Sequence, residues 1–187
     1  FAAAPQVHGI SYHEARRVTD FPGSINVLMG LLSSREVSDI THVNTVLLLG
    51  YTGEARVVPQ LREYLEQPRH EGPLRPLELF GRLQVPLALG AIMGQTTDQA
   101  ARREILTYLG DGVTPEAWRK RVGWPAGNDG PEFADLARNT IRALGLSALP
   151  EVPGLLNRAE TKVRRLEDGW KRLRHGEGLS MLVAMTE

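Results

Sequence analysis

The sequence predicts an all-α protein built of helical hairpins that stack against one another. The chain of 187 residues is rich in the helix formers Leu, Ala, Arg and Glu, and only 6% of its residues are aromatic. Apolar residues recur at helical spacing in one segment after another. Three segments also share a Leu-Gly pair that is followed by a turn and a second amphipathic helix. Self-similarity of this kind indicates that helix pairs repeat along the chain.

The composition is that of an ordinary globular domain. Hydrophobic residues make up 42% of the chain and charged residues 24%, and a chain of this length can bury roughly 70% of its unfolded surface. Lys and Arg total 22, as do Asp and Glu, so no net charge attracts the chain to nucleic acid or to an anionic membrane. The absence of cysteine excludes thiol nucleophiles, disulfides and thiolate metal sites.

The first two helices are expected at residues 11–18 and 24–34. Ser11 and Glu14 have the spacing of a capping box, so the first helix is expected to begin at Ser11. The turn residues DFPG then separate the two helices. We interpret residues 1–23 as an entry segment and cap.

The next two helices form the clearest hairpin. The stretch VNTVLLLGYTG is apolar on most sides, which is typical of an enclosed helix, and Gly53 suits the left-handed conformation that ends one. Pro59 falls within the first turn of the following helix, where backbone N–H groups lack intrahelical partners. Val58, Leu61 and Leu65 recur there at helical spacing. The sequence therefore predicts a helix, a tight turn and an antiparallel helix.

A second hairpin and an insertion follow. The apolar stretch 77–94 is expected as a helix that Pro86 kinks or divides, and residues 96–112 are expected as its partner. In the insertion at 110–131, Thr114 and the proline after it have the positions of an N-cap and a first helical residue. A short helix is therefore expected inside the insertion.

We interpret the whole chain as a single repeat domain. Its expected parts are the entry segment and cap (1–23), the first repeats (24–109), the insertion (110–131), the last repeat (132–156) and a C-terminal capping helix with a tail (157–187).

The repeat is visible when three pieces of the sequence are aligned. They are VLLLGYTGEARVVPQL, PLALGAIMGQTTDQAARREIL and IRALGLSALPEVPGLL, and their Leu-Gly glycines are Gly50, Gly90 and Gly145. A period of roughly 40 residues is typical of paired-helix repeats. The second interval is longer because it contains the insertion. Each glycine is expected to end its helix, and Gly50 and Gly145 would also let neighbouring helices approach closely.

These pieces resemble the HEAT repeat family, in the short bacterial HEAT-like type that is also found in phycobilisome lyases. The resemblance covers residues 24–156. It departs at Glu54, where the family usually has aspartate, and in the middle piece, which lacks the Val-Pro pair. The resemblance implies a short right-handed α-solenoid, or α-α superhelix, of about three helical hairpins with atypical terminal helices. It also implies binding of other macromolecules through a curved surface, with no chemistry of its own.

Two groups of residues are candidates for a partner-binding surface. The family's usual geometry implies a ridge on the second helices, made by Gln60, Arg62, Glu63, Arg102 and Arg103. The insertion adds a cluster of side chains that are favoured at interfaces, namely Trp118, Arg119, Arg121 and Trp124. The alternative for the cluster is that both tryptophans fold back and cover the neighbouring repeat.

The sequence carries no recognisable catalytic, cofactor or metal motif. His8, His13 and Glu14 do not have the helical spacing of a two-histidine zinc site. The acid–glycine turns LGDG and GNDG lack the further oxygen ligands of a calcium loop and the setting of a phosphate loop. We therefore expect no cofactor and no metal, although carboxylate pairs that form only in space stay open.

The sequence favours a non-enzymatic protein-binding or scaffolding module whose partner is another protein. An alternative is a HEAT-like nucleic-acid-binding or base-processing protein, because basic residues outnumber acidic ones in 158–174. The balanced total charge opposes this alternative. A further alternative is a lyase-like chaperone for a chromophore or cofactor.

The location of the protein depends on its N-terminal end. If residues 1–6 follow a removed signal peptide, the protein is exported, and otherwise we expect it in the cytoplasm. No transmembrane segment is expected, because no apolar stretch approaches the roughly 20 residues that span a membrane.

Overall fold

The computed structural model describes residues 12–69, 71–124 and 131–157, and all the regular structure in these residues is helical. The all-α prediction is therefore confirmed for this part of the chain. The helices are α1 (Tyr12–Thr19), α2 (Ser24–Ser33), α3 (Asp39–Thr52), the 3-10 helix η1 (Ala55–Val57), α4 (Val58–Glu66), α5 (Pro76–Gln95), α6 (Gln99–Gly110), α7 (Pro115–Arg121) and α8 (Glu132–Leu146). A further helical segment begins at Val152. The expected N-cap Ser11 and the expected capping helix beyond Asn157 lie outside the described residues.

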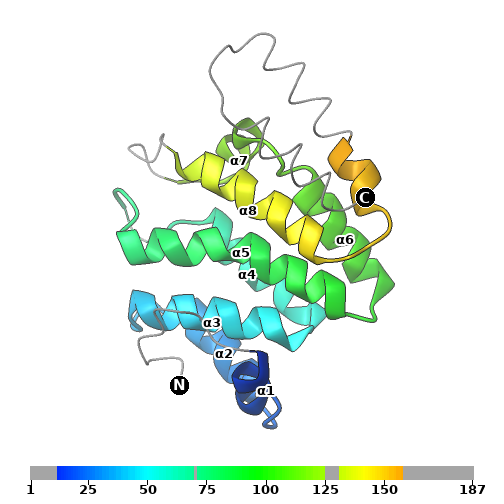
Figure 1. The fold of residues 1–187 in the computed structure, drawn as a ribbon. Helices are drawn as coiled ribbons and strands as arrows, with labels where there is room; N and C mark the ends of the chain where they lie inside the picture. The colour runs from blue at the N-terminus through cyan, green and yellow to red at the C-terminus, as the bar shows by residue number, and fades with distance from the viewer. Residues whose placement is uncertain (1–11, 70, 125–130, 158–187) are drawn as a thin grey trace.

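The helices form two layers. Figure 1 shows α3, α5 and α8 side by side and running in the same direction, with α4 and α6 behind them. The closest packing within the front layer is between α3 and α5 and between α5 and α8. The small helices α1 and α2 lie against the free side of α3, and α7 packs against α8. The central helix α5 is therefore the element on which the rest of the domain is assembled.

The helices α3 and α4 form where the sequence predicts them. The Ser38 hydroxyl accepts a hydrogen bond from the Thr41 backbone N–H at the start of α3, and Gly53 ends α3 with a φ of 69°. Pro59 lies in the first turn of α4. Leu61 and Leu65 of α4 are fully buried.

Proline does not divide α5, which is one helix of 20 residues with Pro86 inside it. The expectation of a division was wrong. Proline removes one backbone N–H from the helix ladder and loosens the preceding turn. Next to this turn, the Asn139 side chain of α8 donates a hydrogen bond to the Leu83 carbonyl oxygen (2.7 Å). Packing on both sides by α3 and α8 also stabilises the helix across the proline.

The glycines of the repeated Leu-Gly pairs allow the front helices to touch. A Cβ atom added to Gly50 would lie 2.9 Å from Ala88 Cα of α5, and one added to Gly90 would lie 2.6 Å from the Ala143 carbonyl oxygen of α8. Neither glycine ends its helix, since α3 continues to Thr52 and α5 to Gln95. The expectation that the Leu-Gly pair ends these helices was therefore wrong. The glycines are needed inside the helices, where two backbones approach without a side chain between them.

The finer prediction of a solenoid stays a prediction. A solenoid requires both layers of helices to stack regularly, and contacts between the described helices are extensive only in the front layer.

Adding one methyl group to Gly90 should destabilise the domain. In Gly90→Ala the new Cβ would meet backbone atoms of Ala143, so α5 and α8 must separate, and the free energy of unfolding should fall by about 1–3 kcal/mol. Gly30→Ala is the matched control, because Gly30 lies in α2 with open space around it, and there the better helix propensity of Ala should add up to ~1 kcal/mol. Urea denaturation followed by circular dichroism measures both. A Gly90→Ala variant as stable as the parent would contradict the close crossing.

Candidate functional site

The expected ridge on the second helices is largely occupied by contacts within the protein. Arg62 of α4 forms an ion pair with Glu104 of α6 (2.8 Å) and covers the ring of Tyr108. Arg102 of α6 donates hydrogen bonds to the backbone at the end of α5. Gln60 donates to the Ser33 hydroxyl (3.2 Å). These side chains tie neighbouring helices together and are not free to bind a partner in this arrangement.

Glu63 and Arg103 of the expected ridge do face solvent. Glu63 is exposed on α4 and Arg103 on α6, and neither makes an ion pair within the described residues. The predicted ridge is therefore reduced to two exposed side chains of opposite charge.

The tryptophans of the insertion belong to the core. Trp118 is fully buried, and its indole Nε1 donates a hydrogen bond to the Thr140 hydroxyl of α8 (3.2 Å). Trp124 is half-buried and stacks on Phe133, with its Nε1 donating to the Leu65 carbonyl oxygen (2.8 Å). Trp118 cannot present its ring to a partner, so we remove it from the expected binding surface. The alternative of tryptophans that cover a neighbouring unit fits this geometry.

The two arginines of the same cluster differ. Arg121 lies over the ring of Tyr108 (4.3 Å to the centroid) and donates to the Tyr108 carbonyl oxygen (2.9 Å). Arg119 is exposed, with its guanidinium 5.4 Å from the centroid of Phe133. Of the four residues of the expected insertion cluster, only Arg119 and the accessible part of Trp124 are available to a partner.

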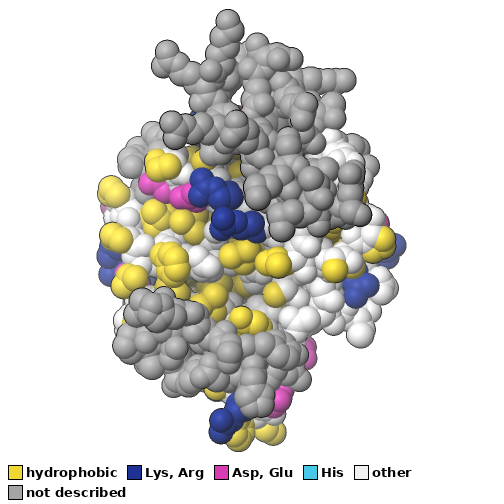
Figure 2. Space-filling model, in the orientation of Figure 1, with side chains coloured by type: hydrophobic (Ala, Val, Ile, Leu, Met, Phe, Trp, Pro, Cys, Tyr) yellow, Lys and Arg dark blue, Asp and Glu magenta, His cyan; other side chains and the backbone are white. Residues whose placement is uncertain are grey.

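A different surface, which sequence reasoning missed, is the outer side of α5. We define the α5 face as Leu77, Phe80, Gln84, Leu87 and Ala91, which share one side of the helix because they are three or four residues apart. Leu77 and Phe80 are 48% and 49% exposed. The space-filling view shows hydrophobic side chains gathered over α5 and α3, with Lys or Arg side chains over α8 at their border (Figure 2). The α5 face carries no charge, and Gln84 is the one polar residue among its five members.

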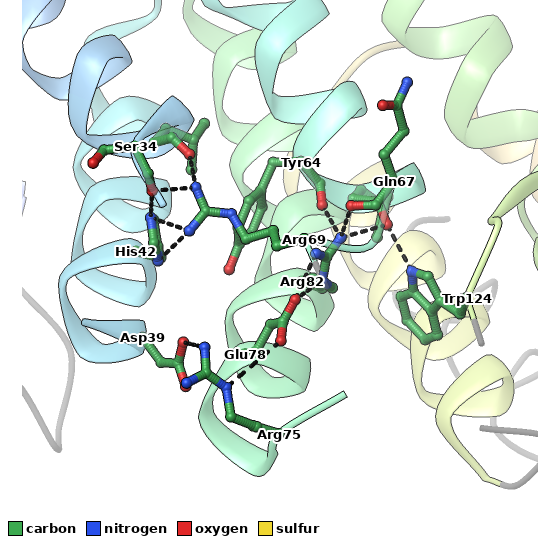
Figure 3. Close-up of polar contacts among 12 residues, drawn as sticks. Ser34, Asp39, His42, Tyr64, Gln67, Arg69, Arg75, Glu78, Arg82 and Trp124 are labelled. Carbon is green, nitrogen blue, oxygen red and sulfur yellow. Dashed lines mark hydrogen bonds and ion pairs between the residues drawn. The ribbon is translucent and has the colours of Figure 1, made fainter. Parts of the chain in front are cut away.

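The two charges of α5 lie inside the protein. Glu78 and Arg82 are 1% and 0% exposed and form an ion pair with 2.7 Å between Arg82 Nη2 and Glu78 Oε1 (Figure 3). They are four residues apart, so both project from the side of α5 that is opposite the α5 face. The helix therefore keeps both of its charges in the core, while Leu77 and Phe80 face solvent.

The hydrogen bonds of Arg82 account for the burial of its positive charge in the core. Its guanidinium donates to the carbonyl oxygens of Tyr64, Leu65 (3.3 Å) and Gln67 (2.8 Å), at the C-terminal end of α4. The last carbonyl groups of a helix have no partner within the helix and carry partial negative charge, so a guanidinium satisfies them well. The Gly123 N–H donates to the Glu66 carbonyl oxygen (2.9 Å) and completes the cap.

A second arginine performs the same task for α2. Arg69 donates to the carbonyl oxygens of Leu32 (2.7 Å) and Ser34 (2.6 Å), just after α2 ends (Figure 3). His42 of α3 lies beside it, with Nε2 3.0 Å from the Ser34 carbonyl oxygen and Nδ1 2.9 Å from Arg69 Nη1. Arg69 Nη1 also lies 2.5 Å from His42 Nε2. Because a guanidinium can only donate, at least one ring nitrogen accepts, which fits a neutral imidazole.

Burial shifts the pKa values of His42 and Tyr64 in this polar cluster. Burial first, and then the Arg69 guanidinium, lower the pKa of His42 from its ordinary value of 6.5. Burial raises the pKa of Tyr64 to about 12, so its hydroxyl stays protonated near neutral pH. The cluster thus holds a neutral histidine and a neutral tyrosine between arginines that cap two helices. Its arrangement serves the structure, and within residues 12–69, 71–124 and 131–157 no group of three His, Asp or Glu side chains is placed to hold a metal ion.

The length and composition of α5 also correct an expectation. At 20 residues α5 is long and apolar enough to cross a membrane, which contradicts the expectation that no apolar stretch approaches this length. The core helix of a folded domain passes the same test, and 56% of the apolar window of α5 is buried.

Comparison with protein-family models, with curated proteins and with solved structures finds no match for this chain. Its function must therefore be inferred from its own residues.

Removal of Arg82 should destabilise the domain strongly. Arg82→Met leaves the Glu78 carboxylate buried without its closest partner and removes the guanidinium donor from the carbonyl groups at the end of α4, so the free energy of unfolding should fall by about 3–5 kcal/mol. The double variant Glu78→Leu, Arg82→Met should be more stable than Arg82→Met alone, because the buried carboxylate is removed as well. Denaturant unfolding measures both, and a double variant that is less stable than the single one would contradict this account.

Acid should weaken the contacts around His42. The pKa of His42 is lowered in the folded state, so below about pH 6.5 the unfolded chain binds a proton that the folded chain does not bind, and the free energy of unfolding falls. The difference in stability between the parent and His42→Gln should therefore shrink from neutral pH to about pH 5. Unfolding titrations at several pH values measure it, and a difference that grows in acid would contradict a neutral His42.

Proposed function

We propose that this chain is a non-enzymatic protein-binding module and that it binds its partner through the α5 face. The observation that carries the proposal is that α5 buries both of its charges and leaves Leu77 and Phe80 exposed. Apolar side chains in contact with water reduce the stability and the solubility of a domain, and contiguous apolar patches commonly mark interaction sites. A protein partner that covers the α5 face would remove this exposed apolar surface from water.

The neighbouring helix extends the proposed surface. Ile40, Leu47 and Tyr51 of α3 are half-buried, and α3 carries its single acidic residue, Asp39, in its first turn. Asp39 is paired with Arg75 at the end of the front layer (2.7 Å). Two adjacent helices thus offer an uncharged surface. The centre of a protein interface is typically depleted of charge and enriched in apolar and aromatic side chains.

A stacked-hairpin architecture of HEAT-like type is part of the proposal. Its support is the equivalence of two helix crossings, because Gly50 meets Ala88 and Gly90 meets Ala143. In each crossing the glycine of one Leu-Gly pair meets the residue two positions before the next such glycine in the sequence. Equivalent residues in equivalent contacts are expected of stacked repeats. The proposed binding surface then lies on the layer of first helices and not on the ridge of second helices.

Photochemical crosslinking tests the proposal and separates the two surfaces. The chain is prepared with p-benzoylphenylalanine in place of Phe80 on the α5 face or in place of Arg103 on the expected ridge, and each is irradiated in extract from the native source. Protein adducts at position 80 and none at position 103 are expected. Adducts only at position 103 would restore the ridge as the binding site and contradict the role of the α5 face. The absence of protein adducts at both positions would contradict the binding function.

A further inference from the structure

The α5 face has an internal symmetry. Leu77 and Ala91 lie seven residues before and after Gln84, and Phe80 and Leu87 lie four before and three after it. Consider a second copy of α5 that packs antiparallel on the first, with the two Gln84 residues at the centre. Each large side chain of one helix then lies opposite a smaller or similar side chain of the other. Phe80 meets Leu87 of the other helix, Leu77 meets Ala91, and the two Gln84 amides face each other. The stripe is therefore complementary to its own antiparallel copy.

The charges on α8 have the same symmetry. Asp135 lies four residues before Asn139, the middle residue of α8, and Arg142 lies three residues after it, as Phe80 and Leu87 do about Gln84. Arg138 lies between them and pairs with Asp135 in the same chain (2.6 Å). Arg142 is exposed and makes no ion pair within the part of the chain that the structure describes. An antiparallel copy of α8 would place a second Asp135 opposite Arg142 and a second Arg142 opposite Asp135.

The two symmetries share one axis. The Asn139 side chain in the middle of α8 reaches the Leu83 carbonyl oxygen in the middle of α5, so the two midpoints lie side by side. Figure 1 shows that the two helices run in the same direction in one layer. One two-fold axis, parallel to the layer and perpendicular to the helices, therefore passes both midpoints. The axis that pairs the apolar side chains also pairs the charges.

We propose that a second copy of this chain binds the α5 face about this axis and forms a symmetric dimer; the inference rests on the proposed function and names its partner. An interface of this kind is isologous, with the same surface contributed by both chains. Homodimer interfaces are more apolar than transient ones, which fits an uncharged centre with ion pairs at one border.

The charge pattern distinguishes a second copy from other occupants. An anionic membrane surface offers a single sign of charge and would leave Asp135 facing like charge. An antiparallel copy instead offers Arg142 to Asp135, which Arg138 of the same chain also contacts, and offers Asp135 to Arg142. The α5 face and α8 together therefore specify a copy of themselves.

Sedimentation of the purified chain over a range of concentrations tests the dimer. With rising concentration, the average molar mass is expected to increase reversibly from the 20.7 kDa of one chain to twice that value. Phe80→Glu should yield a monomer at every concentration, because it places a charge at the centre of the interface. Phe21→Glu is the matched control, since Phe21 is 69% exposed in the turn between α1 and α2, and it should leave the dimer unchanged. Helical circular dichroism verifies that each variant is folded.

A charge exchange tests the axis itself. Arg142→Asp and Asp135→Arg should each weaken self-association by about tenfold or more, since each homodimer then brings like charges together. A mixture of the two variants should dimerise again, because an Arg142→Asp chain and an Asp135→Arg chain complement each other at both ends. Arg119→Asp on α7 is the control and should have no effect.

Several outcomes would overturn the second copy as the occupant. They are a chain that stays monomeric at the highest concentration, a dimer that survives Phe80→Glu, and variants whose mixture does not associate better than each alone. If the chain is monomeric but position 80 captures another protein in extract, the second copy is wrong and the binding function stands. If position 80 captures nothing and the chain is monomeric, both are wrong.

Discussion

The guanidinium of Arg82 joins the end of α4 to the side of α5. Four carbonyl groups at the end of any helix lack partners within the helix, and Tyr64 and Leu65 in the last turn of α4 are buried. Arg82 supplies donors to three carbonyl oxygens in this region, and Glu78 balances its charge. Neither member of the pair is tolerable without the other in a dry interior. The position of α4, the direction of α5 and the path of the loop between them all follow from this contact.

This interior charge pair has a consequence at the surface. A helix of 20 residues between two neighbours has one side towards the second layer and one side towards solvent. Because Glu78 and Arg82 occupy the inner side, the outer side of α5 is left with Leu77, Phe80, Leu87 and Ala91. The α5 face carries no charge because both charged residues of α5, Glu78 and Arg82, lie on its inner side. The inner side of α5 therefore stabilises the fold, and its outer side forms the proposed binding surface.

The front layer depends on small residues as much as on the charge pair. Gly50 and Gly90 bring α3, α5 and α8 close together, and the close spacing makes the outer surface of the layer continuous. The insertion contributes on the other side, where Trp118 fills the space beside Gly112 and Trp124 covers the end of α4. A segment that interrupts the repeat in the sequence therefore completes the core in space. This explains why Trp118 is buried and Trp124 half-buried although both stand in or beside a polar, glycine-rich stretch.

The sequence by itself determined the helical class, the positions of most helices and their ends. Apolar spacing and local caps such as Gly53 and Thr114 act within one or two turns of chain, so they are readable without knowledge of the fold. It did not determine which side of α5 faces solvent, because a helix that is apolar on nearly all sides reads as enclosed. The pair Glu78 and Arg82, four residues apart in an apolar helix, was the available signal. Only the tertiary structure decided the rest, since the partners of Arg82, Gly90 and Trp118 come from elements distant in the chain, and no local pattern specifies contacts of that kind.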